Sequence, residues 1–311
     1  MSALVSKFND SRIRYINTGK RVSMSHNWEF ALDHVTEGWV TVLGDDDTLL
    51  TGALTSVNKI IDETGTLAIR SNGCGYSWPS LLGERYGNLT ISLKKGYQRL
   101  QSKDSLITVL NGDLHYNKLP VLYNGGFVDI FLVKKAKSIT GDFFLSMNPD
   151  VYSAMVFSLL TDEYVYSAEP LAINGASHHS GGTAGFEKIK RKRSYDPVEK
   201  FYAEDNIPFH HDLPLLNNQR PVRSIPAIVY EAYLQAAPFH DQKNLTVLAE
   251  KQLEVILRNS SPHHDEVRSW GMSFAELHKL RYEEILNKSA SKQKHLCAAL
   301  KKIMARLENL A

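Results

Sequence analysis

The first half of the chain alternates short apolar runs with segments of helical periodicity. Apolar runs rich in β-branched or large residues predict strands at residues 12–16, 39–43 and 67–70. Between them, apolar positions spaced three and four residues apart predict helices over 23–35 and 49–61. A strand, helix, strand, helix order is typical of an α/β protein with a mostly parallel sheet flanked by helices. We therefore expect that fold class.

The later pattern is more interrupted and then becomes helical. It predicts strands at 89–93, 105–110 and 171–174, and helices at 128–136 and from Pro149 onward. Beyond Tyr195 it predicts helices joined by proline-bearing loops, over residues 227–236, 245–257, 274–286 and from 292. We expect an α/β domain over 1–190 and a helical C-terminal region over 195–311.

The last predicted helix carries an apolar stripe with a seven-residue repeat. Its members are spaced four, three, four and three residues apart: Leu296, Leu300, Ile303, Leu307 and Leu310. The stripe is too short to predict a coiled coil. We expect it to dock on its own domain, with dimer contact or membrane-surface association as the alternatives.

Composition narrows the class of protein. The chain has 311 residues, 43% of them hydrophobic, and a net charge of +2, so it can bury a core and has no overall attraction for nucleic acid. Cys74 and Cys297 are too far apart in the sequence to suggest a disulfide framework or a cysteine metal site. The start lacks a signal-peptide core, and no apolar run is long enough to span a bilayer. We expect a cytoplasmic protein, with association at the inner face of the membrane as an alternative.

The apolar run at 39–43 ends in Gly44 and three aspartates, Asp45, Asp46 and Asp47. In open α/β sheets, ligands bind beyond the carboxyl ends of the strands. Because side chains alternate along an extended chain, we expect Asp45 and Asp47 to point the same way and Asp46 to point elsewhere. Two carboxylates on one side suit Mg²⁺ or Mn²⁺, and such an ion suits a diphosphate.

The same aspartates also allow a plainer interpretation. They would form a solvated turn in which Asp47 or Thr48 caps the following helix, and this is compatible with metal binding. An EF-hand loop counted from Asp45 fails, because Leu50 would stand at its glycine and Ser56 at its glutamate.

A second candidate carboxylate is Asp150, which follows Pro149 at a predicted helix start. Its plainer interpretation is a charge favoured there by the helix dipole. Gly73 and Gly75 do not form a dinucleotide-binding fingerprint, because Trp78 stands where a third glycine is required.

Together these segments resemble a known family. Residues 9–50, NDSRIRYINTGKRVSMSHNWEFALDHVTEGWVTVLGDDDTLL, resemble the catalytic domain of glycosyltransferase family 2, the inverting transferases with an A-type fold. The resemblance is carried by RIRYI, by Asn27 and Ala31, and by GDDD. It continues through GDFFLSMNPDVYSA and PLAINGASHHSGG, and so covers roughly the first 185 residues.

The resemblance implies transfer of a sugar from a nucleotide diphosphate sugar to a hydroxyl group of a sugar or lipid-linked glycan, with inversion, in cell-surface polysaccharide or glycan assembly. It implies that Asp45, with Asp46 and Asn27, contacts the donor and that Asp47 binds a divalent metal, Mn²⁺ or Mg²⁺. It implies that Asp150 takes the proton of the acceptor hydroxyl.

The resemblance also implies one histidine ligand for the metal. In A-type transferases a late histidine sometimes completes the metal shell, and the resemblance implies His178 for this place. His179 would point the opposite way in an extended chain. Two adjacent pairs lack metal-ligand spacing and are predicted to be surface residues: His210-His211 and His263-His264.

One part of the family pattern has no counterpart in this sequence. The family's domain opens with a strand, a helix and a second strand that form one wall of the nucleoside site, whereas RIRYI comes almost at once here. We expect that either the true chain starts upstream or this chain binds nucleotide weakly and with little base selectivity. Two other classes stay open: a non-catalytic, transferase-like binding subunit, and a metal-dependent phosphate-ester hydrolase.

Overall fold

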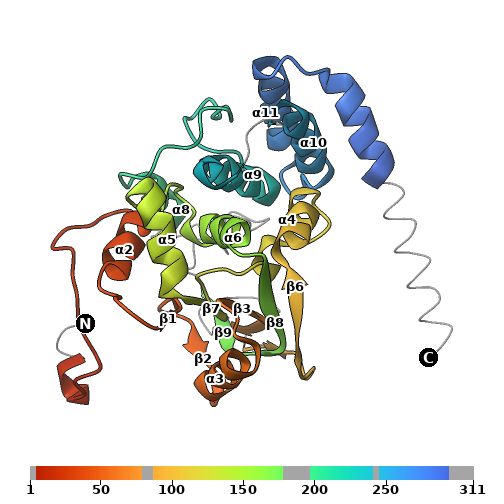
Figure 1. Cartoon of the computed structure of the whole chain (residues 1–311). Helices are drawn as coiled ribbons and strands as arrows, with labels where there is room; N and C mark the ends of the chain where they lie inside the picture. The colour runs from red at the N-terminus through yellow and green to blue at the C-terminus, as the bar shows by residue number, and fades with distance from the viewer. Residues whose placement is uncertain (1–4, 79–86, 178–196, 241–244, 294–311) are drawn as a thin grey trace.

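The structure is a computed structural model that describes residues 5–78, 87–177, 197–240 and 245–293. It is a mixed α/β protein with two β-sheets flanked by helices (Figure 1). The α/β class expected from the sequence is therefore confirmed. The predicted apolar stripe after residue 294 lies outside the described residues.

The larger sheet has five strands in the order β1-β7-β3-β8-β6. The bounds are β1 Trp39–Val40, β7 Gly126–Asp129, β3 Ala68–Asn72, β8 Glu163–Pro170 and β6 Tyr97–Gln101. The smaller sheet has the order β2-β9-β4-β5. Its strands are β2 Thr48–Leu49, β9 Ala172–Ala176, β4 Cys74–Ser77 and β5 Leu89–Ile91.

Strand pairing is mixed, not mostly parallel as expected. Among the pairings of the described strands, β3 with β8 and β4 with β9 are parallel, and the others are antiparallel. The chain passes from β3 directly into β4 and from β8 directly into β9. The parallel pair β3 and β8 of the larger sheet therefore continues as the parallel pair β4 and β9 of the smaller sheet. This shared pair brings the Asp45–Asp47 turn beside β9, because β2 pairs with β9 directly after the turn.

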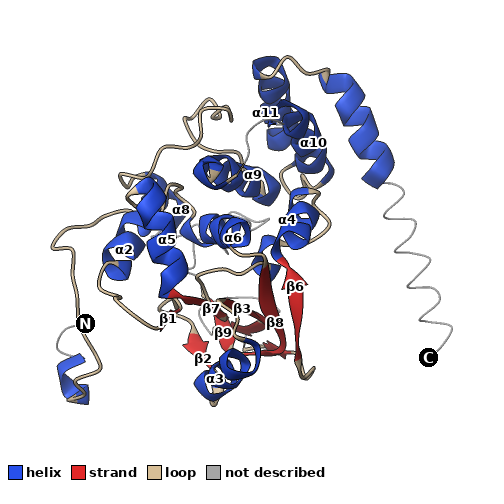
Figure 2. Cartoon of the chain, in the orientation of Figure 1, coloured by secondary structure: helices blue, strands red, loops and turns tan. Residues whose placement is uncertain are grey.

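Helices cover both faces of the larger sheet (Figure 2). On one face, α3 (Ala53–Thr64) packs Ala53, Val57 and Ile60 against β3, β7 and β8. On the other face lies α6 (Pro149–Leu160), nine of whose residues are buried. The helix α6 also packs against α2 (Met24–Leu32), α4 (Ser102–Leu110), α5 (Ile130–Thr140) and α9 (Ile225–Gln235). This central helix therefore joins the sheet layer to the helical C-terminal residues.

The C-terminal helices form a second core. Apolar side chains of α9, of α10 (Leu245–Arg258) and of α11 (His264–Leu277) pack together, and a further helix at residues 282–293 adds Ile285. A shorter helix, α8 (Pro197–Tyr202), precedes them, and the single turns are η1 Ser6–Phe8, η2 Tyr116–Lys118 and η3 Ala237–Phe239. None of the described helices is long and apolar enough to cross a bilayer.

Several predicted elements are wrong. Residues 12–16 form no strand, and Ile13 and Tyr15 are exposed, so this apolar run has no sheet to join. The run at 105–110 belongs to α4, which buries Leu106, Val109 and Leu110 beneath α6, because a short apolar run suits either a strand or a buried helix. The helix expected from residue 49 begins at Ala53 instead.

Further differences concern element boundaries and missed strands. Residues 48–49 pair with β9, so the cap of α3 is Gly52, not Asp47 or Thr48. The single helix expected at 274–286 is divided between α11 and the helix at 282–293. The strands β4, β6, β7 and β8 were not predicted, although β7 and β8 lie inside the larger sheet.

Candidate functional site

The segment between β1 and β2 is a turn held together by the Asp47 carboxylate. Asp47 Oδ2 accepts a hydrogen bond from Gly44 N at 2.9 Å, and the Asp47 backbone N–H donates to Gly44 O at 3.2 Å. Asp47 Oδ1 accepts from Gly175 N, on β9, at 2.8 Å. The carboxylate therefore fixes both its own turn and the position of that turn against the smaller sheet.

Oxygen atoms converge beside Gly44. A methyl group built on Gly44 would lie 2.9 Å from Asp47 Oδ2, 3.1 Å from the Tyr123 hydroxyl and 3.3 Å from Asp46 Oδ1. We call this group of three oxygens the Gly44 cradle. Residues 45 and 46 form a turn, so the alternation expected of an extended chain is wrong here, and Asp46 converges with Asp47. Asp45 is exposed.

Trp78 locks the other side of this turn. Its Nε1–H donates to Asp46 O at 2.9 Å, and its backbone N–H donates to Ala176 O at 2.9 Å. A methyl group built on Gly175 would lie 1.9 Å from Asp46 O, so only glycine allows the turn and β9 to approach this closely. The aspartate turn is thus a rigid part of the fold.

Asp150 lies in the first turn of α6, where Pro149 starts the helix as predicted. Asp150 is half-buried, and its Oδ2 accepts a hydrogen bond from the Tyr116 hydroxyl at 2.8 Å. Desolvation raises the pKa of Asp150, while the hydrogen bonds from Tyr116 and from the backbone act in the opposite direction. The group is therefore a stronger base than an exposed aspartate.

Tyr123, in the loop before β7, lies between the two sets of carboxylates. Its hydroxyl converges with Asp47 Oδ2 and Asp46 Oδ1 beside Gly44. Burial raises the pKa of Tyr123, and so do the negative charges of Asp47, Asp150 and Asp46. Tyr123 therefore lies at the aspartate turn and within the electrostatic influence of Asp150, although these carboxylates are about a hundred residues apart in sequence.

A buried cation supports the same loop. Arg70, on β3, donates from its Nη1 to Tyr123 O at 3.1 Å and to Asn124 O at 2.8 Å, and from its Nε to Asn117 O. Desolvation lowers the pKa of Arg70 to about 10. Lys118 Nζ, in η2, donates to Asn72 Oδ1 at 3.1 Å and to the Tyr166 hydroxyl at 2.7 Å. Sequence reasoning missed Arg70, although an arginine at the end of an apolar strand was a visible signal.

Asn124 is a second residue that sequence reasoning missed. It follows Tyr123 with a positive φ of 38°, and its backbone N–H donates to Val42 O at 2.9 Å. Its side chain is buried, and neither its amide nitrogen nor its amide oxygen has a hydrogen-bond partner among the described residues. Such an amide next to the cradle is suited to a polar ligand.

The remaining predicted site residues are not gathered here. Asn27 lies on the exposed side of α2, in a shallow hollow of about 300 Å³ shared with Lys20, Arg21 and Glu204. Its neighbour Trp28 reaches the site by packing on the Tyr123 ring, with centroids 5.6 Å apart. The donor-binding role of Asn27 stays a prediction. His178 lies outside the described residues, as do the residues that follow it up to 196.

Comparisons with known proteins add little to this description of the site. No family model matches the chain, and no curated protein matches it either. Among solved structures, the chain is similar to a crystal structure of S. aureus TarS 1-349 in complex with UDP-GlcNAc. The match has 12% identity and a TM-score of 0.46, and it covers 94% of this chain and 79% of that one. A likeness at this level carries no conclusion about activity.

Proposed function

We propose that this chain is a metal-dependent inverting glycosyltransferase that moves a sugar from a nucleotide diphosphate sugar to a hydroxyl acceptor. One observation carries the proposal. The Tyr123 hydroxyl lies beside Asp47 Oδ2 at the Gly44 cradle, and the charge of Asp150 also raises its pKa, which supports placing the proposed metal ligand and the proposed base at one site. These are the two groups that the sequence resemblance independently assigns to the chemistry.

Asp150 is the proposed general base. It accepts the proton of the acceptor hydroxyl while that oxygen bonds to the anomeric carbon and the bond to the diphosphate breaks on the opposite face. The Tyr116 hydroxyl donates a hydrogen bond to Oδ2 of Asp150, which orients the carboxylate so that Oδ1 can accept the proton of the acceptor hydroxyl. The raised pKa of Asp150 makes proton transfer more favourable than it would be to an exposed aspartate.

The Gly44 cradle fits a divalent cation. Asp46 Oδ1 and Asp47 Oδ2 are hard oxygen ligands close to one point, and the absence of a side chain on Gly44 leaves space beside them. Asp47 and His178 are the proposed ligands of Mn²⁺ or Mg²⁺, as the resemblance implies, and Asp45 with Asn27 contacts the donor. Asp46, which the resemblance assigns to the donor, is proposed here as a further metal ligand, because its Oδ1 converges with Asp47 Oδ2. When bound, the ion compensates the charge of the departing diphosphate. Arg70 and Lys118 add positive charge on the protein side.

A second function has a specific observation in its favour. Both oxygens of Asp47 accept backbone hydrogen bonds, from Gly44 N and Gly175 N, as expected of a carboxylate that only fixes a turn. On that basis the chain would be a transferase-like binding subunit without turnover. Each carboxylate oxygen has two lone pairs, so these bonds do not prevent metal binding.

The deciding experiment measures binding and turnover separately. The melting temperature is recorded with Mn²⁺ and a panel of nucleotide sugars, because a bound donor stabilises the fold by mass action. Nucleoside diphosphate release is then followed with and without sugar acceptors. Acceptor-dependent release supports the transferase. Stabilisation without release supports the binding subunit. If no donor produces either effect, both proposals are contradicted. Phosphate release without an acceptor indicates hydrolysis.

A further inference from the structure

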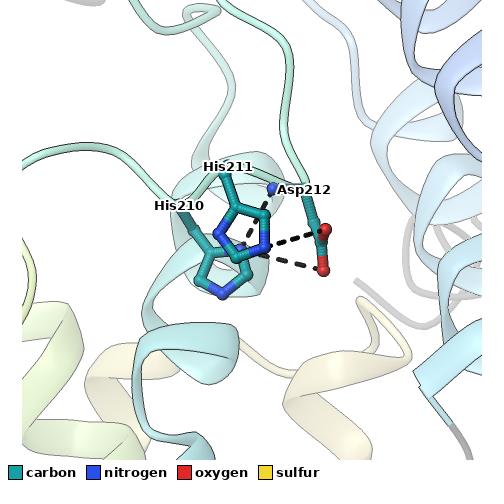
Figure 3. Close-up of side chains that lie close together, drawn as sticks. All are labelled: His210, His211 and Asp212. Atoms are coloured by element: carbon teal, nitrogen blue, oxygen red, sulfur yellow. Dashed lines mark hydrogen bonds and ion pairs between the residues drawn. The ribbon is translucent and has the colours of Figure 1, made fainter.

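Three consecutive residues, His210, His211 and Asp212, turn their side chains toward one another in the loop between α8 and α9 (Figure 3). Asp212 Oδ2 lies 3.9 Å from His210 Nδ1, and Asp212 Oδ1 lies 3.5 Å from His211 Nε2. One ligand atom from each residue lies within 4.8 Å of the other two. The sequence analysis judged His210 and His211 by their spacing alone and predicted no metal-binding arrangement. Spacing does not show the turn that brings the three side chains together.

The turn is held in place by contacts that do not use the Asp212 carboxylate. Leu213 N donates to His210 O at 3.0 Å and closes the turn, and the Leu213 side chain is buried. His278, at the end of α11, hydrogen-bonds through Nε2 to Asp212 O at 2.7 Å. Because the backbone of the turn is fixed to the end of α11, little ordering would be needed before a ligand binds.

The separations match those between two ligands of one metal ion. Zinc–nitrogen and zinc–oxygen bonds are about 2.0–2.2 Å long, so two ligands at a tetrahedral ion lie roughly 3.4 Å apart. The measured 3.5 and 3.9 Å need only small side-chain rotations to reach that value. Two imidazoles with one carboxylate suit Zn²⁺, Ni²⁺ or Cu²⁺ better than Mg²⁺ or Ca²⁺.

We propose that His210 Nδ1, His211 Nε2 and the Asp212 carboxylate bind one transition-metal ion of the Zn²⁺ class, with water completing its shell. The ion replaces one hydrogen bond, from Asp212 N to His210 Nδ1, whose length of 3.2 Å is at the long end of the range. The His211 side chain is 86% exposed, so the ion reaches the site from solvent. The site shares no residue with the Gly44 cradle.

The bound ion would stabilise the folded protein. Asp212 contacts the end of α11 through His278. An ion that bridges three side chains of this turn stabilises the folded loop that carries them and its contact with the helical core. Its loss should lower the melting temperature without removing the Gly44 cradle.

The test uses untagged, full-length protein freed of metal with EDTA and then dialysed. Zn²⁺ is titrated calorimetrically into the wild type, His211→Gln, Asp212→Asn and the control His26→Gln. His26 is exposed like His211 but lies on α2, away from the triad. We expect one Zn²⁺ equivalent in the wild type and in the control, and at least about tenfold weaker binding in both triad variants.

Melting temperatures complete the test. Zn²⁺ should raise the melting temperature of the wild type and of Asp47→Asn, but not that of His211→Gln. Because His211 is exposed, its replacement leaves the fold intact, so an unfolded variant cannot imitate the expected loss. Zn²⁺ binding of equal strength in His211→Gln and the wild type, or none in the wild type, overturns the proposal.

Discussion

The Tyr123 hydroxyl and the Asp47 carboxylate meet at the Gly44 cradle, where the loop before β7 reaches the aspartate turn. The hydroxyl lies 3.1 Å from the position of the missing methyl group, and Asp47 Oδ2 lies 2.9 Å from it. Four predictions follow from this site and one from the helical core.

Replacing Asp47 by alanine should remove metal-dependent donor binding and also destabilise the fold. The substitution leaves Gly44 N and Gly175 N without their acceptor, which costs about 1–3 kcal/mol for each donor that water cannot reach. Asp45→Ala is the matched control, because Asp45 is exposed in the same turn. Urea unfolding and Mn²⁺-dependent thermal shifts measure the two effects. Unchanged Mn²⁺-dependent donor binding in Asp47→Ala would remove this residue from the metal site.

Asp150→Asn should abolish turnover while preserving donor binding. The amide keeps the shape of the side chain but cannot accept the proton, and general-base catalysis typically contributes about 10²–10⁴-fold. Steady-state transfer and donor-induced thermal shifts are compared with those of Asp104→Asn, an exposed first-turn aspartate of α4. A variant that keeps most of its transfer rate would show that the base is another group.

Tyr116→Phe should shift the acidic limb of the pH–rate profile to higher pH. The Tyr116 hydroxyl stabilises ionised Asp150, so its removal raises the pKa of Asp150 further. The base must be ionised to act, and activity is therefore lost at a higher pH as the solution is acidified. Transfer rates across the pH range measure the shift. An unchanged limb, or a shift to lower pH, would contradict the role given to this hydrogen bond.

Gly44→Ala should weaken metal binding while the chain still folds. The added methyl group would lie closer than about 3.4 Å, the tight end of van der Waals contact, to all three cradle oxygens. These oxygens belong to side chains, which can move away and thereby disperse the ligands. Gly73→Ala is the control, since nothing lies within 4 Å of a methyl group there. Mn²⁺ affinity is read by calorimetry, and equal affinities of the two variants would argue against a metal in the cradle.

The free energy of unfolding should fall as pH rises, because the buried Glu231 carboxyl group resists ionisation. This group is buried on α9, where it accepts hydrogen bonds from Ser146 at 2.6 Å and Gln235 at 3.0 Å. Burial raises its pKa from 4.5 to about 7. Below pH 4.5 the group is protonated in both folded and unfolded chains. Between 4.5 and 7 only the unfolded chain ionises, so up to about 3 kcal/mol of stability is lost by pH 7 and above.

Glu231→Gln removes this titration while it keeps the size of the side chain. We expect it to raise the melting temperature at pH 8 and to change it little at pH 4.5. The measurements are made in EDTA, so that no metal at the neighbouring turn contributes. Glu284→Gln, which alters an exposed acidic side chain paired with Arg281, is the comparison. A gain at pH 8 no larger than that at pH 4.5 would show that Glu231 does not titrate as described.

The sequence by itself determined the α/β class, the helix starts at Ser23 and Pro149, and a strand at 171–174, which the structure has as β9 at 172–176. These features depend on local patterns: a side-chain cap, a proline in the first turn and a short apolar run. The sequence also singled out Asp47 and Asp150 as unusual, because each stands where an apolar element ends or begins. Their roles stay predictions.

The tertiary structure alone decided how those residues meet. Strand direction depends on partners far along the chain, so local periodicity could not show that β1 pairs antiparallel with β7. The turn at Asp45–Asp46 follows from contacts with Gly175 and Trp78, which override the alternation of an extended chain. Tyr123 and Arg70 carry no motif in the sequence. They enter the site because packing brings the loop before β7 onto β3, and such long-range contacts are absent from any local pattern.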